Sequence, residues 1–238
     1  MRRTLWLPNQ SLTNSTGAGK DYLAVFDPSA GTSKHLPLVR FDTKTGLSTA
    51  GFDVVSASEE PNHVFVYAIN NRKSEGHVLV DGPNSVVEIF KSDASGFKLS
   101  YVATVKDPLI GMPNDIIGAP DGKSFFLTTD AKTKGSWGRF ADILFGRENT
   151  FVTWCHVEDG CKVVARRLRT ASGIARGPQG EIYIANMFAS SISVFEEQAD
   201  HSLMLTDTIP VGGGALDGIS VDADGALFVS EIPKVCHG

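Results

Sequence analysis

Three stretches of the sequence decide the fold: "NDIIGAPDGKSFFLTTD" (residues 114–130), "SGIARGPQGEIYIANMF" (172–188) and "DGISVDADGALFVSEIP" (217–233). Each starts with a polar residue, a small or acidic residue and isoleucine, passes a turn with glycine after Asp or Gln, and ends in aromatic and β-branched residues. Such runs on either side of a turn predict a strand–turn–strand unit. A looser copy, "AGFDVVSASEEPNHVFVYAIN", occupies residues 50–70.

The four copies align on Phe52, Ile116, Ile174 and Ile219, which are 64, 58 and 45 residues apart. A repeat of this length with several strands per unit is typical of a β-propeller. Helical periodicity is nearly absent, and the other apolar runs are also short and bounded by turn residues. We therefore expect an all-β chain, a single propeller domain over residues 1–238, with blades starting near residues 50, 114, 172 and 217. The alternative is a β-sandwich whose turns are alike by chance.

Composition excludes several other classes of protein. With 42% hydrophobic and 21% charged residues, the chain is ordinary globular protein rather than disordered. A net charge of −5 disfavours a nucleic-acid partner. No apolar run is long enough to predict a membrane span, and Pro8 ends the apolar run at the start too early for a signal peptide. We expect a soluble protein of unknown localisation.

The cysteines are too few for a disulfide scaffold. Cys155 and Cys161 bracket "HVEDG", whose Asp-Gly predicts a hairpin turn, so a cross-strand disulfide is one possibility. It would place the two Cα atoms about 4.4–6.8 Å apart. Cys236 should be unpaired. A zinc site would require more ligands at closer spacing, so zinc is disfavoured.

The propeller interpretation assigns a position to four more residues. The first residues of each innermost strand face the central channel, and Ala50, Asn114, Ser172 and Asp217 lie two positions before the aligned apolar residues. Three of these four carry side-chain oxygens. Converging oxygens suit a hard cation, above all calcium. The alternative is that the polar residues only cap turns at the strand starts.

The same segments carry a family resemblance. "MPNDIIGAPDGKSFFLTTD", "ASGIARGPQGEIYIANM" and "LDGISVDADGALFVSEIPK", together with "GFDVV", "YAINN" and "SVVEIFK", resemble the paraoxonase/arylesterase family. The resemblance runs from about Asp21 to Lys234. It implies a six-bladed, gluconolactonase-like propeller of the calcium-dependent phosphotriesterase type. It also implies two channel calcium ions and hydrolysis of lactones or aryl esters, with a histidine dyad that activates water.

The resemblance also assigns roles to residues of this chain. Asn114 and Asp217 match ligands of the catalytic calcium, and Ser172 stands where the family has a third, asparagine ligand. Asp115 matches a ligand of the structural calcium, and Phe52 a position that offers its backbone carbonyl to that ion.

Several family positions are changed. The dyad positions read Ala50 and Asn71, so the catalytic residues are unknown, and "TND-His" reads Thr129-Asp130-Ala131. We therefore expect weak or lost calcium binding and weak or absent hydrolase activity. The alternative is a non-catalytic propeller that binds a small ligand or a protein partner through its channel face. A strictosidine-synthase-like enzyme is disfavoured, because no glutamate occupies a matched channel position.

Length bears on the architecture. At the spacings of the repeat, six blades would need well over 300 residues. The 238 residues of this chain correspond to about four to five four-stranded blades. We therefore expect an incomplete propeller, from either a fragment or a shortened relative.

Overall fold

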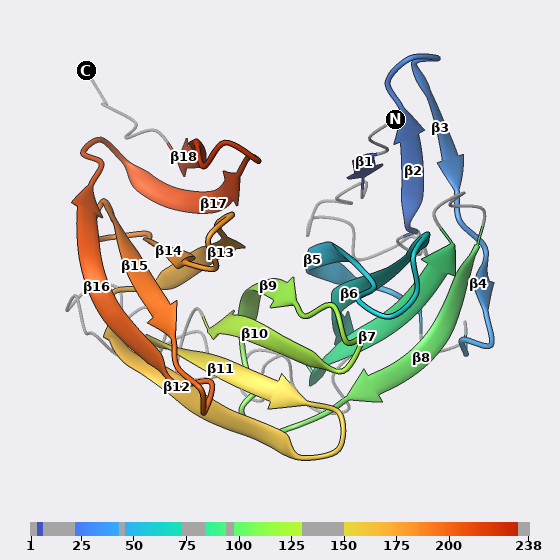
Figure 1. Ribbon diagram of the computed structural model, residues 1–238, viewed down its shortest axis with the longest axis horizontal. Coiled ribbons are helices and arrows are strands. Elements are labelled where there is room, and N and C mark those ends of the chain that lie inside the picture. The colour runs from blue at the N-terminus through green and yellow to red at the C-terminus, as the bar shows by residue number, and fades with distance from the viewer. Residues whose placement is uncertain are drawn as a thin grey trace, which may run out of the picture.

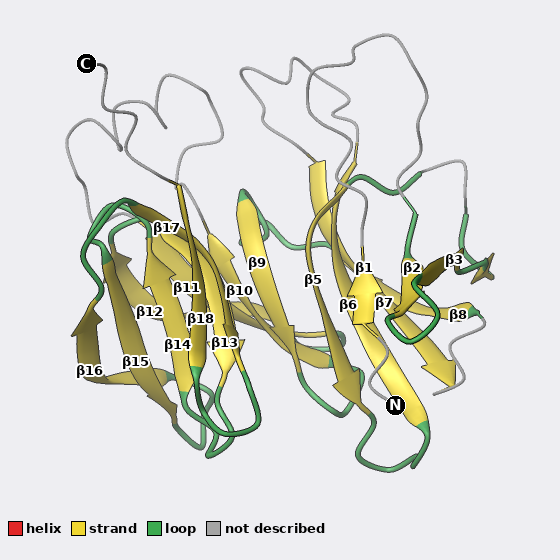
Figure 2. Ribbon diagram, turned by 90° about the horizontal axis from the view of Figure 1, so that it is seen from above, coloured by secondary structure: helices red, strands yellow, loops and turns green. Residues whose placement is uncertain are grey.

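A computed structural model describes residues 4–6, 22–42, 46–72, 84–93, 98–129 and 150–232. This part of the chain consists of strands and turns and contains no helix (Figure 2). Accordingly, none of the described residues belongs to a helix that could cross a membrane.

The strands form five sheets, which are antiparallel except where β4 pairs with β8. The first sheet contains β1 (Thr4–Trp6), β2 (Ala24–Asp27) and β3 (Thr32–His35). The second contains β4 (Leu38–Val39), β5 (Thr49–Ser56), β6 (His63–Arg72), β7 (Asn84–Asp93) and β8 (Leu99–Val105). The third contains β9 (Pro113–Gly118), β10 (Ser124–Thr129), β11 (Thr150–His156) and β12 (Gly160–Leu168). The fourth contains β13 (Ala171–Arg176), β14 (Ile182–Asn186), β15 (Ser191–Glu197) and β16 (Leu203–Pro210), and the fifth β17 (Ala215–Val221) and β18 (Leu227–Ile232).

The sheets are arranged as successive blades of an open arc. Figure 1 shows β5, β9, β13 and β17 on the inside, and the arc is open between β17 and β18 on one side and β1 and β2 on the other. The prediction of an incomplete β-propeller is confirmed, and two stacked sheets are excluded.

Local chemistry explains the turns within the repeat. Between β9 and β10, one carboxylate oxygen of Asp121 accepts hydrogen bonds from the backbone N–H groups of Lys123 and Ser124. Gly122 adopts a φ of 72°, which glycine reaches without strain. The turn sequence therefore fixes the register of the two strands that carry the channel residues.

The hydrophobic core lies between neighbouring blades. The second and third blades share Tyr67, Ile89, Phe125 and Leu127, each fully buried. Equivalent clusters join the first blade to the second and the third to the fourth. Because such clusters join successive blades, the packing of one blade depends on the presence of its neighbour.

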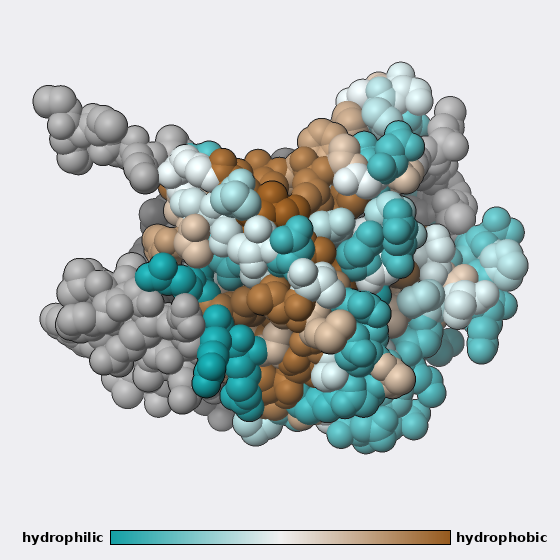
Figure 3. Space-filling model, turned by 60° about the vertical axis from the view of Figure 1, so that its left-hand side comes forward, coloured by the Kyte–Doolittle hydropathy of each residue, from teal (hydrophilic) through white to brown (hydrophobic). Residues whose placement is uncertain are grey.

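Hydrophobic side chains also reach the surface of the last two sheets. Met204 and Leu205 in β16 are about half exposed, as are Phe228 and Ile232 in β18. Figure 3 shows hydrophobic residues gathered in the middle of the face that it presents, with hydrophilic residues around them.

Cys155 and Cys161 form a disulfide between β11 and β12, with their Cα atoms 4.1 Å apart. This separation is slightly shorter than the expected range, and the two residues lie directly opposite each other in the antiparallel ladder. Cys236 lies outside the described residues.

Candidate functional site

Two glycines allow the inner strands to approach at the channel. A Cβ atom on Gly51 would lie 2.8 Å from the backbone oxygen of Asn114, and one on Gly173 would lie 2.7 Å from the backbone oxygen of Asp217. No residue with a Cβ atom fits at these distances, so both positions require glycine. The strand starts that the sequence analysis aligned are therefore side by side, β5 against β9 and β13 against β17.

The four residues predicted to face the channel differ in how far their side chains are exposed. Asp217 and Ala50 are exposed and Asn114 is half-buried. Ser172 is fully buried, and its hydroxyl lies 3.0 Å from the backbone oxygen of Leu216 and 3.2 Å from that of Ala185. Of the three oxygen-bearing side chains, only those of Asn114 and Asp217 are accessible at the channel.

Asp115 bonds two inner strands together. One carboxylate oxygen accepts a hydrogen bond from its neighbour Ile116 at 2.9 Å, and the other accepts one from the backbone N–H of Ile174 in β13 at 3.1 Å. Burial raises the pKa of Asp115 to about 6, and the charges of Asp53 and Asp217 add to the rise. The backbone hydrogen bonds oppose this rise because they favour the charged form.

Asp53 is a second carboxylate of this kind, and the sequence analysis did not identify it. It accepts hydrogen bonds from the backbone N–H of Val54 at 2.7 Å and from that of Gly118 in β9 at 2.8 Å. Burial raises its pKa, while those two bonds and the charge of Arg176 lower it. Its position two residues after Gly51 on one face of β5 is the signal that could have revealed it.

The two carboxylates share a cavity of about 340 Å³ between the inner strands. Its lining comes from β5, β9, β13 and β17 and includes Phe52, Ile117, Arg176, Ile219 and Ser220. The lining therefore combines polar and charged groups with apolar side chains, and small-molecule sites contain both kinds. The cavity can hold a compact ligand that presents a polar edge to Asp53 and Asp115.

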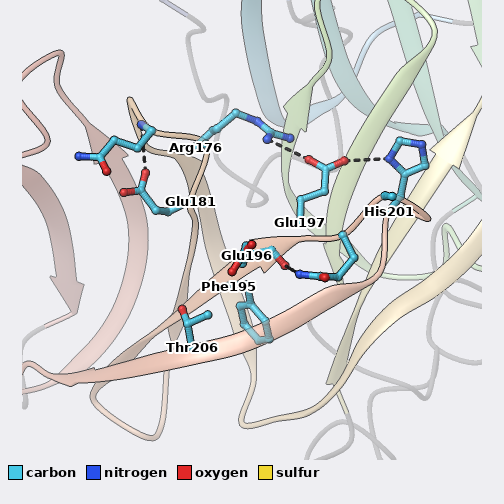
Figure 4. Close-up of a pocket in the computed structure, with 11 residues that line it drawn as sticks. Arg176, Glu181, Phe195, Glu196, Glu197, His201 and Thr206 are labelled. Atoms are coloured by element: carbon cyan, nitrogen blue, oxygen red, sulfur yellow. Dashed lines mark hydrogen bonds and ion pairs between the residues drawn. The ribbon is translucent and has the colours of Figure 1, made fainter.

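Arg176 also borders a more open hollow of about 700 Å³ beside the β13–β14 and β15–β16 turns (Figure 4). There its guanidinium bonds Glu197 at 2.9 Å, and Glu197 also contacts the His201 ring at 2.8 Å. The residue therefore forms part of the wall of both cavities.

The two positions that the resemblance matched to the histidine dyad hold side chains that cannot act as bases. The Ala50 side chain has no polar atom, and the Oδ1 atom of Asn71 accepts a hydrogen bond from the Ser85 hydroxyl at 2.7 Å. Asp130 and Ala131 lie outside the described residues.

A buried polar network next to Asn71 holds the start of β5. The Glu88 carboxylate is fully buried and accepts hydrogen bonds from Asn70 at 3.0 Å and from Arg72 at 2.7 Å. Asn70 in turn accepts a hydrogen bond from the backbone N–H of Ser48 at 2.9 Å. The network therefore positions the segment that leads into the channel.

The donors at the channel mouth fit calcium only in part. Calcium requires six to eight oxygen ligands. Asn114 and Asp217 have accessible oxygens, whereas the Ser172 hydroxyl is occupied by backbone carbonyls. No group of three His, Cys, Asp or Glu side chains poised for a metal occurs in the ranges that the structure describes. The described residues therefore supply only part of a calcium ligand set at the channel mouth.

Comparison with known proteins agrees with this architecture. The sequence profile of the arylesterase family matches residues 5–237. Serum paraoxonase/lactonase 3 of Homo sapiens is 27% identical over 180 residues, which cover 75% of this chain and 46% of that protein. The chain therefore spans about half the length of this curated relative.

Two solved structures show the same fold. A periplasmic gluconolactonase of Pseudomonas aeruginosa aligns with a TM-score of 0.56 at 15% identity, over 96% of this chain and 61% of that one. A gluconolactonase of Xanthomonas campestris aligns with a TM-score of 0.51 at 17% identity, over 88% and 62%. At such identities the likeness concerns the fold. Because the family profile covers nearly the whole sequence, the chain belongs to the arylesterase family, whose members include the paraoxonases.

Proposed function

We propose that this chain is a hydrolase of lactones or aryl esters that binds calcium weakly and turns over slowly. The observation that carries the proposal is the accessibility of Asn114 and Asp217 on β9 and β17, the two inner strands that flank β13, where Asp115 and Asp53 line a cavity of about 340 Å³. Membership of the arylesterase family supports the reaction class.

Asp217 and Asn114 would hold the cation. When bound there, calcium supplies Lewis-acid polarisation of a carbonyl group. Asp217 contributes the one anionic oxygen of the pair and Asn114 a neutral oxygen. Since calcium affinity follows the charge and number of ligands, we expect a Kd in the millimolar range, about 10⁻³ M.

Water activation is the missing part of this site. With Ala50 and Asn71 at the dyad positions, neither residue can remove a proton from water. General acid–base catalysis typically contributes about 10²–10⁴-fold to the rate. We therefore expect turnover slower by about that factor than that of a site with both histidines.

Thermal unfolding with calcium and with a chelator tests the proposal. At a calcium concentration of about 100 Kd, binding to the folded state adds about 2.7 kcal/mol to its stability. Asp217→Ala should abolish the shift, whereas Glu59→Ala, which removes an exposed carboxylate outside the channel, should leave it unchanged. Hydrolysis of a γ-lactone and an aryl ester is measured in parallel. Fast calcium-dependent turnover, or a shift that survives Asp217→Ala, would contradict the proposal.

A second candidate function is binding without catalysis. The cavity supports it, because its apolar side chains and its charged groups Asp53, Asp115 and Arg176 together suit a small polar ligand whether or not a reaction follows. In that case a lactone would raise the Tm in the presence of chelator and would be recovered unhydrolysed.

A further inference from the structure

Three arginines lie close together in the chain at the outer edge of the third sheet. Arg166 and Arg167 belong to β12, which Figure 1 shows on the outside of the arc, and Arg169 follows directly after this strand. All three are exposed. The segment from residue 160 to residue 180 has five Lys and Arg residues and no Asp or Glu, in a chain whose net charge is −5. Positive charge is therefore concentrated in this part of an acidic protein.

A β-bulge places two consecutive arginines at the surface. Thr150 of β11 pairs with Leu168 and Phe151 pairs with Arg166, so Arg167 has no partner residue in the ladder. Its φ is 61°, in the left-handed region that residues other than glycine rarely adopt. Because the bulge interrupts the alternation of side chains along the strand, Arg166 and Arg167 are both exposed while Leu168 is buried. Backbone conformations of this kind cost stability and cluster at functional sites.

These three residues, the arginine patch, lack acidic neighbours. Elsewhere on the surface an exposed cation pairs with a carboxylate, as Lys123 does with Glu158 at 3.1 Å. Within the described ranges, no ion pair or hydrogen bond involves the side chain of Arg166, Arg167 or Arg169. Like charges repel one another, so an anion bound here would relieve the repulsion within the patch.

We propose that the arginine patch binds an acidic polysaccharide, a linear sugar polymer that carries sulfate or carboxylate groups. A guanidinium group presents several N–H donors in one plane, which suits oxyanions that accept two hydrogen bonds at once. Successive residues of a strand are about 3.3 Å apart, so the patch forms a strip about 10 Å long. A linear polymer with repeated anionic groups can follow such a strip.

Charge and backbone geometry favour this partner over other anionic ones. The rest of the chain is acidic, so a membrane surface or a DNA duplex, whose charge extends well beyond the strip, would also approach carboxylates. A flexible polysaccharide can contact the strip alone. The bulge at Arg167 disfavours an acidic peptide that would add a further strand to β12, because such pairing depends on a regular ladder of backbone groups.

Calorimetric titration with heparin at about 50 mM salt tests the proposal. Arg166→Glu combined with Arg169→Glu leaves the bulge residue in place and should raise the heparin Kd about tenfold or more, because two of the three cationic contacts are lost. Lys98→Glu combined with Lys106→Glu makes the same change in net charge at the two ends of β8 and should change the Kd by less than about twofold, because long-range effects are screened.

Two further measurements separate binding by the patch from a structural role. Arg167→Gly suits the φ of 61° and removes only the cation, so it should weaken heparin binding without lowering the Tm. For the unaltered chain, raising the salt concentration from about 50 to about 200 mM should weaken binding about tenfold or more, because about three counterions are released.

The outcomes are separable, provided that circular dichroism shows each variant to be folded. No binding of heparin at about 50 mM salt would overturn the proposal and would leave the arginines as protection of the sheet edge against pairing. Equal losses in the two double variants would show that net charge, not the patch, governs binding. Tighter binding of duplex DNA, or of vesicles of phosphatidylserine and phosphatidylcholine, would overturn the assignment of a polysaccharide.

Discussion

Loss of the Glu88 side chain should strongly destabilise the chain. Its carboxylate is fully buried and accepts hydrogen bonds from Asn70, from Arg72 and, at 2.5 Å, from the hydroxyl of Thr104. Breaking a buried ion pair by removing one partner costs about 3–5 kcal/mol. We therefore expect Glu88→Ala to lower the free energy of unfolding by about 4 kcal/mol. For a chain of this size that corresponds to a fall in Tm of about 8–16 °C.

Urea unfolding followed by circular dichroism measures this loss, and the chain offers a matched control. Glu60 also pairs with a cation, Lys91, but its side chain is 51% exposed, so Glu60→Ala should cost at most about 1 kcal/mol. Combining Glu88→Ala with Arg72→Met should cost less than the sum of the two single changes, because neither charge is then left unpaired. A cost of Glu88→Ala no larger than that of Glu60→Ala would refute the reasoning.

Three further predictions concern stability. The pKa of Asp115 is raised to about 6 in the folded state, from about 3.9 in the unfolded chain, so the folded state holds this proton more tightly. The free energy of unfolding should therefore fall as the pH rises from about 4 to 6. Asp115→Asn should flatten that dependence in urea titrations across this range. Gly173→Ala should lower the free energy of unfolding by about 1–3 kcal/mol in the same assay, because the new Cβ atom would lie 2.6 Å from the backbone nitrogen of Ile219. An unchanged stability would show that β13 and β17 can move apart without cost. Replacing Cys155 and Cys161 together by alanine should cost about 2 kcal/mol, the value expected for a loop this short, and a loss near zero would contradict the chain-entropy reasoning.

The sequence was sufficient to predict the propeller because the repeat encodes local structure. Its turns, such as the one around Gly122, follow from residues that adopt few other conformations. Its strands follow from β-branched and aromatic runs. The alignment on Phe52, Ile116, Ile174 and Ile219 then located the four inner strands, since equivalent residues of successive blades lie at equivalent places in the arc.

The site was less accessible to sequence reasoning because its interactions join residues far apart in the chain. Asp53 bonds Gly118, 65 residues away, and nothing in the local sequence specifies that bond. For Ser172 the local pattern was misleading. Its place in the repeat predicted an oxygen facing the channel, but packing buries its hydroxyl against the backbone oxygen of Leu216 in β17. A single repeat unit does not show which face of a strand the next blade covers.

The two channel carboxylates, Asp53 and Asp115, also have a structural role that does not depend on a metal. Inner strands of neighbouring blades belong to different sheets, so the sheets' own ladders do not join them. Asp53 joins β5 to β9, and Asp115 joins β9 to β13, each through a backbone N–H of the next blade. An ionised carboxylate has about four lone-pair sites and these bonds use only two, so either group can also face a cation without releasing the strand. The two carboxylates can therefore hold neighbouring blades in register around the cavity whether or not a cation binds at the channel mouth.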